Sequence, residues 1–144
     1  MTPDVNVLVA ASRSDHPHHT AARAWLEEAL SAVESGASFT LMPMVVASML
    51  RLVTSPKIFV QPTPMVDAVA FIDAILATPG AQLASLGAEW PKLRKLCLDK
   101  QLAGNDLPDG WLAAAVDQQA EHLVTFDRDF KKLLPRARLT HLKV

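Results

Sequence analysis

Apolar residues in this chain form short runs and helical stripes that alternate along its length. The run Val5–Ala11 is short and rich in β-branched residues, which predicts a strand buried on both faces. His18–Glu34 instead repeats its apolar residues at helical spacing, and Leu107–Glu121 does so more strongly. The two patterns together predict strands that are connected by helices.

The remaining segments continue this alternation. The other expected strands are Ser38–Met42, Gln82–Ser85, His122–Phe126 and Arg138–Leu142. The other expected helices are Val45–Val53, one that Thr63 caps and Pro64 begins, Glu89–Leu102, and a short turn near Phe130–Leu134. This order predicts an α/β fold with three α/β/α layers and a central, mostly parallel sheet. No repeat or linker divides the chain, so we expect residues 1–144 to form a single domain.

Composition narrows the class of protein. Half of the 144 residues are hydrophobic and the formal charge is -1, which excludes an intrinsically disordered chain and one that is basic throughout. The single cysteine, Cys97, excludes an intramolecular disulfide. The start lacks the pattern of a secretory signal, and no apolar run is long enough to span a bilayer. We therefore expect a cytoplasmic protein without a membrane partner.

Three acidic residues stand where a purely structural chain does not need them. Asp4 comes directly before the first apolar run, and Asp127 directly follows the predicted strand His122–Phe126. Asp109 lies on the same helical stripe as Leu112, where a carboxylate is costly unless it is paired, capped or bound to a cation. Ligands of parallel sheets bind at the carboxyl ends of the strands, so these acids are candidate site residues.

Each acid also has a structural interpretation. Asp106 could cap the late helix, with Asp109 in its favoured first turn. Asp127 could cap the following turn, and Asp4 could be an ordinary solvated residue. Three clustered carboxylates would repel one another, however, and would call for a hard divalent cation such as Mg²⁺ or Mn²⁺.

Several motifs carry a family resemblance. They are DVNVLVAA (4–11), DHPHH (15–19), LRLVTSPKIF (50–59), GNDLPDGWLAAAV (104–116) and LVTFDRDF (123–130). In this order and spacing, the chain from Asp4 to about Leu134 resembles PIN-domain ribonucleases of the VapC toxin type. The segment with Arg51, Thr54 and Pro56 is similar to one subgroup of that family.

The resemblance implies a metal-dependent endoribonuclease that is the toxin half of a toxin–antitoxin pair. It implies Mg²⁺, with Mn²⁺ as an alternative, a cognate antitoxin as inhibitor, RNA as substrate, and a homodimer. The catalytic and metal-binding residues would be Asp4, Asp109 and Asp127. Supporting roles would fall to Asn6, Asp106, Thr125 and Asp129, with the Thr125 hydroxyl orienting a water or a phosphate oxygen.

One departure from the family pattern leaves an alternative open. Many members carry a glutamate three residues before Arg51, and this chain has Ser48 there. The alternative is a catalytically weak PIN-fold module that binds RNA or a protein partner. A phosphoryl-transfer enzyme of the haloacid-dehalogenase type is disfavoured, because its second carboxylate would fall on Asn6.

Basic residues gather after the last acidic motif and suggest a surface for phosphates. The candidates for RNA contact are Arg51, Arg128, Lys131 and Lys132. The competing interpretation is a solvated charged surface, with Arg51 bridging an acid on a neighbouring helix. The histidines at positions 16, 18 and 19 are interpreted as polar loop residues near the rim of the site.

Overall fold

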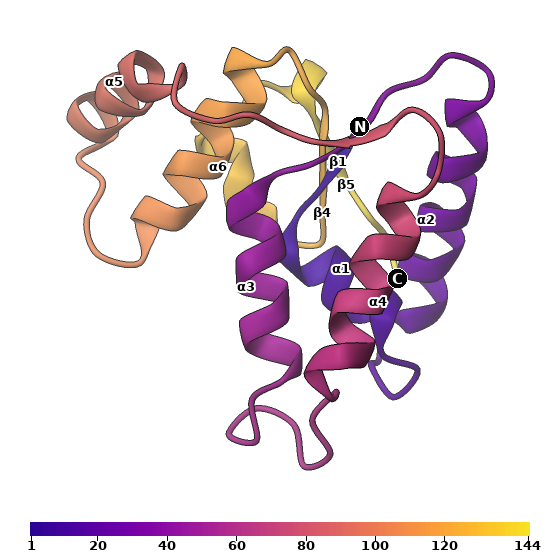
Figure 1. Ribbon diagram of the computed structural model, residues 1–144. Helices are drawn as coiled ribbons and strands as arrows, with labels where there is room; N and C mark the ends of the chain where they lie inside the picture. Colours follow the sequence, from indigo (N-terminus) through magenta and orange to yellow (C-terminus); the bar gives the residue numbers. More distant parts are fainter.

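Five short strands, every pair of them parallel, lie at the centre of the molecule in a computed structural model that describes residues 1–144 (Figure 1). The strands are β1 (Thr2–Pro3), β2 (Phe39–Leu41), β3 (Ala81–Leu83), β4 (Leu123–Thr125) and β5 (Leu139–His141). One sheet has the order β1-β4-β5, and β2 pairs with β3 in a second. The Thr40 amide donates to the Met1 carbonyl at 2.9 Å and joins the two sheets edge to edge.

Helices flank the strands on both sides (Figure 1). They are α1 (Val5–Ser12), α2 (His19–Val33), α3 (Pro43–Val53), α4 (Met65–Leu76), α5 (Trp90–Lys100) and α6 (Asp106–Gln118), followed by the 3-10 turns η1 (Arg128–Lys132) and η2 (Arg136–Arg138). The predicted α/β fold with a central parallel sheet is confirmed.

The predicted strand Val5–Ala11 is wrong, because this segment forms helix α1. Apolar runs of this length fit a buried strand or a buried helix equally well. Asp4 decides the outcome: its side chain accepts a hydrogen bond from the Val5 amide and begins the helix. Val7 to Ala11 are all buried, because α1 packs against α2, α3 and β4.

Two other boundaries differ from expectation. Thr63 does not cap α4, since its hydroxyl accepts from Arg13, and Pro64 occupies the cap position without a side-chain bond. Helix α6 ends at Gln118 rather than Glu121. Ala120 takes a left-handed conformation with φ of 52°, which turns the chain before β4. Glu121 therefore lies outside the helix.

The sheet topology brings three segments to one edge. Parallel pairing aligns Pro3 with Val124, so β1 and β4 end side by side. The residues after these strands, Asp4 and Asp127, therefore lie near each other. In α6, Leu112 to Val116 are all buried, which fixes the helix against the core and its first turn at the same edge.

Candidate active site

Asp4 is the most enclosed acid at the carboxyl ends of the strands. It is 6% exposed, accepts from the Val5 amide at 2.7 Å through Oδ1, and accepts from the Thr125 hydroxyl at 2.6 Å through Oδ2. Burial raises the pKa of Asp4 and the Asp127 charge adds to this, although both hydrogen bonds act in the opposite direction. Asp4 therefore both caps helix α1 and stands as a candidate site residue.

Thr125 and Asn6 hold the acid in place. The fully buried Thr125 hydroxyl donates to Asp4, and accepts from the Asp127 amide at 2.9 Å and from Asn6 Nδ2 at 3.3 Å. These bonds use the donor and both acceptor positions of the hydroxyl, which therefore orients Asp4 in this structure; its contact with a water or a phosphate oxygen stays a prediction. Asn6 Oδ1 also accepts from the Phe126 amide at 3.2 Å. The Asn6 and Thr125 side chains orient Asp4 and the start of the loop that carries Asp127.

Asp109 lies in the first turn of α6 and is partly buried. Desolvation, together with the charges of Asp4, Asp127, Asp129 and Asp106, raises its pKa to about 6. Asp109 has no ion pair with a basic side chain. Its environment is therefore strongly negative.

Three further acids, Asp127, Asp106 and Asp129, line the same cavities as Asp109. Asp127 caps η1 by accepting from the Asp129 amide at 2.8 Å, so its predicted capping role is confirmed. The predicted cap at Asp106 is wrong, because Asn105 occupies the cap position and Asp106 accepts from the Ala103 amide at 3.4 Å. Asp106 and Asp129 are both exposed.

Three cavities meet around these acids. The first, of about 400 Å³ and called here the acidic cavity, is lined by Asp4, Asp109 and Asp127 together with Asn6 and His16. The second, of about 620 Å³, is mostly apolar and is lined by Asp4, Asp109 and Ser48 among others. Ser48 therefore stands beside two of the predicted site residues, at the position where the family pattern has its missing acid.

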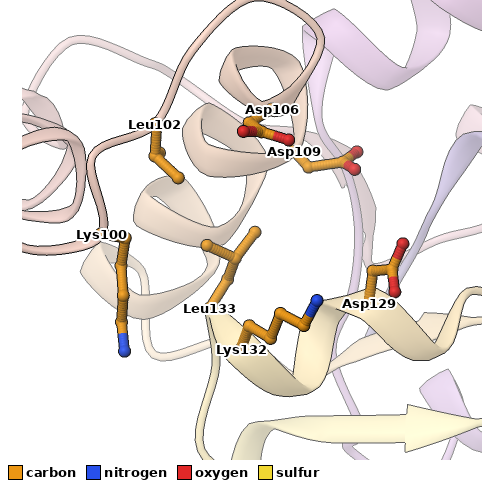
Figure 2. Close-up of a pocket in the computed structure, with 7 residues that line it drawn as sticks. All are labelled: Lys100, Leu102, Asp106, Asp109, Asp129, Lys132 and Leu133. Atoms are coloured by element: carbon orange, nitrogen blue, oxygen red, sulfur yellow. The ribbon is translucent and has the colours of Figure 1, made fainter.

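The third cavity, of about 260 Å³, has mixed charge. Its lining includes Asp106, Asp109, Asp129, Lys100 and Lys132. Figure 2 shows Lys132 reaching from η1 toward the carboxylates, while the Lys100 side chain points away from them. Neither lysine forms an ion pair, so Lys132 offers a free ammonium beside the acids.

The remaining basic candidates lie elsewhere. Arg51 and Arg128 are exposed, and Arg51 makes no ion pair, so the predicted bridge to a neighbouring helix is wrong. Lys131 lines a different cavity with Arg136 and His141. Of the four predicted RNA contacts, only Lys132 lines a cavity with the acids.

The donor chemistry of the site fits a hard cation. Asp4, Asp109 and Asp127 supply carboxylate oxygens to one cavity, and none of the three forms an ion pair that would offset their mutual repulsion. No group of three His, Cys, Asp or Glu side chains is arranged to hold one metal ion. Magnesium commonly takes one or two carboxylates and fills its other positions with water, so three direct ligands are not required.

His16 is a cavity residue that sequence reasoning placed only at the rim. It lines the acidic cavity, and its Nδ1 accepts from the His18 amide at 3.0 Å. Its neighbours serve the fold instead: the His19 ring contacts the Ala10 carbonyl at 2.8 Å, and the His18 ring packs edge-on against Phe126. No periodicity in the sequence separates His16 from the other two.

None of the helices is both long and apolar enough to cross a membrane.

Comparison with known proteins shows which family this chain resembles. A model of the PIN domain matches residues 1–133. Ribonuclease VapC25 of Mycobacterium tuberculosis is 41% identical over 130 residues, which cover 90% of this chain and 89% of that protein. Ribonuclease VapC31 of the same species is 39% identical over the same shares of the two chains.

Two solved structures share the architecture. One is VapBC2 from Rickettsia felis bound to a DNA fragment from its promoter, with a TM-score of 0.67, 19% identity, and coverage of 99% of this chain and 98% of that chain. The other is Mycobacterium tuberculosis VapC20, a Sarcin-Ricin loop cleaving toxin, with a TM-score of 0.60, 13% identity, and coverage of 90% and 92%. At these identities the likeness concerns the fold.

Proposed function

Because this chain belongs to the PIN domain family, we propose that it is an endoribonuclease toxin that hydrolyses RNA with the help of a divalent cation. The observation that carries the proposal is the meeting of Asp4, Asp109 and Asp127 around one cavity at the carboxyl ends of β1 and β4. The relatives at 39–41% identity are ribonucleases of the VapC type, which supports the same reaction.

The chain's own residues divide the work of the site. Asp4, Asp109 and Asp127 would hold Mg²⁺ or Mn²⁺, with Thr125 and the Val5 amide fixing the orientation of Asp4. A divalent cation in such a site supplies a Lewis acid for the phosphate and lowers the pKa of a bound water. Lys132 would contact a phosphate oxygen at the rim, because its ammonium lies beside the acids without an ion pair.

A first experiment compares RNA cleavage by the wild type and by Asp127→Asn, with and without EDTA. We expect the wild type to cleave single-stranded RNA only when Mg²⁺ or Mn²⁺ is present, and Asp127→Asn to be inactive. Asp73→Asn, an exposed acid on α4, is the matched control and should cleave like the wild type. Cleavage that persists equally in EDTA and in Asp127→Asn would contradict the proposal.

Ser48 favours one alternative, a weak PIN-fold binding module. Its side chain borders the cavity that Asp4 and Asp109 also line, so an acid is missing from the site itself. Replacing it, as Ser48→Glu, tests the alternative directly. A gain in metal-dependent cleavage would show that the missing acid limits activity. Cleavage absent from both proteins, with RNA binding retained, would favour the binding module.

We also propose two protein partners, a cognate antitoxin and a second copy of the chain. Several large apolar side chains on or near α5 and α6 are exposed, including Trp90 at 59%, Leu98 at 62% and Trp111 at 42%. Exposed apolar clusters of this kind mark protein interfaces. Light scattering of the chain alone and after co-expression with the product of the adjacent reading frame tests both. A monomer under both conditions would contradict them.

A further inference from the structure

The acidic cavity has two chemically different sides. One carries the carboxylates proposed to act on the phosphate, together with Asn6. The other consists of the apolar lining residues Val5, Val9, Leu52, Ile58 and Phe59, and His16 lines the cavity as well. The ribonuclease proposal uses only the acidic side, so the apolar side has no assigned role.

Phe59 is held in place by a buried arginine. The Arg13 guanidinium lies over the ring, with its central carbon 3.8 Å from the ring centroid. Arg13 is 8% exposed and also donates to Thr63 Oγ1 at 3.1 Å, to the Gln61 carbonyl at 3.0 Å, and to Asp15 at 2.8 Å. These bonds fix the loop between α3 and α4, and with it the ring that lines the cavity.

This arrangement leaves apolar surface uncovered beside the acids. The guanidinium takes one face of the Phe59 ring, so the cavity meets the opposite face or the edge. Ile58 lines the same cavity and is 50% exposed. An aromatic ring and an aliphatic side chain on a fixed loop form a suitable surface for the flat face of a nucleobase.

His16 adds a polar group to this side. Its Nδ1 accepts from the His18 amide, so the neutral ring carries its proton on Nε2. An N–H donor beside an aromatic wall can bond the edge of a base that stacks there.

We propose that the apolar side of the acidic cavity, formed by Phe59 and Ile58 with His16 at its border, binds the nucleobase next to the phosphate that is cut. This inference rests on the proposed ribonuclease function. A phosphate and its base are joined by one sugar, so a phosphate at the acids places a base at a neighbouring surface of the same cavity. Phe59 is then a residue that positions the substrate and influences which base is accepted.

The test uses short single-stranded oligouridylates that carry one 2-aminopurine, placed at a different position in each. The fluorescence of this base falls when it stacks. With Ca²⁺ as the cation, and gels to check that the RNA is intact, we expect the wild type to quench one or two adjacent positions. Phe59→Leu keeps bulk without a ring and should lose the quenching. Phe59→Tyr should retain it.

Affinity and cleavage give a second measurement. Loss of one base-stacking contact weakens binding roughly 5- to 150-fold, so Phe59→Leu should raise the Kd and the KM by that order with a smaller change in kcat. Ile58→Ala should raise the Kd and the KM by a smaller factor than Phe59→Leu does. Val60→Ala is the matched control: Val60 is fully exposed on the same loop, outside the cavity lining, and its variant should behave like the wild type.

The outcomes separate the two proposals. If the wild type neither binds nor cleaves RNA, the proposed function fails and the base site fails with it. If the wild type cleaves RNA while Phe59→Leu matches Val60→Ala in quenching, Kd and KM, the base site is overturned and the ribonuclease stands. Circular dichroism of each variant excludes unfolding as the cause of a loss. If these variants instead weaken only the binding of a co-expressed protein, the surface serves that partner and the base site is equally overturned.

Discussion

Two buried carboxylates lie at opposite ends of the same parallel strands, and their surroundings differ. Asp4 follows β1 and is 6% exposed, whereas Glu121 precedes β4 and is 8% exposed. Glu121 accepts from Thr40 Oγ1 at 2.7 Å and lies 3.0 Å from the Met1 ammonium. Burial alone would raise the pKa of Glu121, but these partners outweigh it and lower the pKa.

The acids around Asp4 lack such compensation. Burial and neighbouring carboxylates raise the pKa of Asp4, and the same causes raise that of Asp109 to about 6. Two acids of similar solvent exposure therefore have pKa values shifted in opposite directions at the two ends of the sheet. A buried acid with a cationic partner stabilises the fold, while a group of acids without one is typical of a functional site.

The largest expected effect separates the two acids by activity. Asp4→Asn should reduce RNA cleavage on the order of 100-fold or more, since it removes a charge proposed to hold the cation. Glu121→Gln, an equally buried acid at the far end of the strands, should cleave like the wild type. Initial rates of cleavage at saturating Mg²⁺ measure both variants. Equal losses of activity would contradict the proposed difference between Asp4 and Glu121.

For stability, the order of the two residues should be reversed, with the larger loss at Glu121. Glu121→Leu leaves the buried Thr40 hydroxyl without its acceptor, and an orphaned polar group costs about 1–3 kcal/mol of unfolding free energy. Asp4→Asn leaves one acceptor oxygen for two donors, the Val5 amide and the Thr125 hydroxyl, but it also removes a repelled charge. The two effects oppose each other, so its stability in metal-free buffer should change less. Urea titrations at pH 7 give both values. A larger loss for Asp4→Asn would contradict the comparison.

The pH dependence of stability should also differ in sign. The pKa of Asp109 rises on folding from 3.8 to about 6. The stability that this residue contributes to the folded state is therefore complete below about pH 4 and is lost as the pH rises to about 6. Asp109→Asn should therefore gain stability over the wild type across that window. The pKa of Glu121 falls on folding, so its contribution is present above its ordinary value of 4.5 and is lost in acid.

The corresponding variant at the other end of the sheet is Glu121→Gln. Its loss of unfolding free energy relative to the wild type should shrink as the pH falls below 4.5. Urea unfolding in metal-free buffer at several pH values follows both variants. Parallel pH curves for Asp109→Asn and Glu121→Gln would show that the two ends of the sheet do not differ as described.

The smallest effect concerns the basic rim. Lys132→Ala should weaken RNA binding a few-fold and reduce the slope of log K against log salt by about 1, because one phosphate contact is lost. Lys143→Ala, at an exposed position near the end of the chain, is the control for net charge alone. Identical salt slopes for the two variants would contradict a phosphate contact by Lys132.

The sequence predicted the parallel α/β fold because most helices and strands have a clear period. It also indicated Asp127, because the strand before it was recognised. Strand β1 could not be recognised: it has two residues, and the apolar run after Asp4 fits a strand as well as the helix that it forms. A capping acid before the run was the available signal.

Other features depend on contacts between distant segments. The Thr125 hydroxyl meets Asp4 across 121 positions, and Arg13 meets Thr63 across 50. No local pattern encodes either contact. The same holds for Glu121, which the sequence placed inside a helix and which instead meets Thr40 in the core.

The difference between the two ends of the sheet can be tested most directly by calorimetric titration of Mg²⁺ and Mn²⁺ into metal-free protein. We expect the wild type and Glu121→Gln to bind the cation, and Asp4→Asn and Asp127→Asn to bind it at least about tenfold more weakly, as loss of a charged ligand requires. Equal affinity in all four proteins, or no binding to the wild type, would contradict a cation site at the carboxyl ends of β1 and β4.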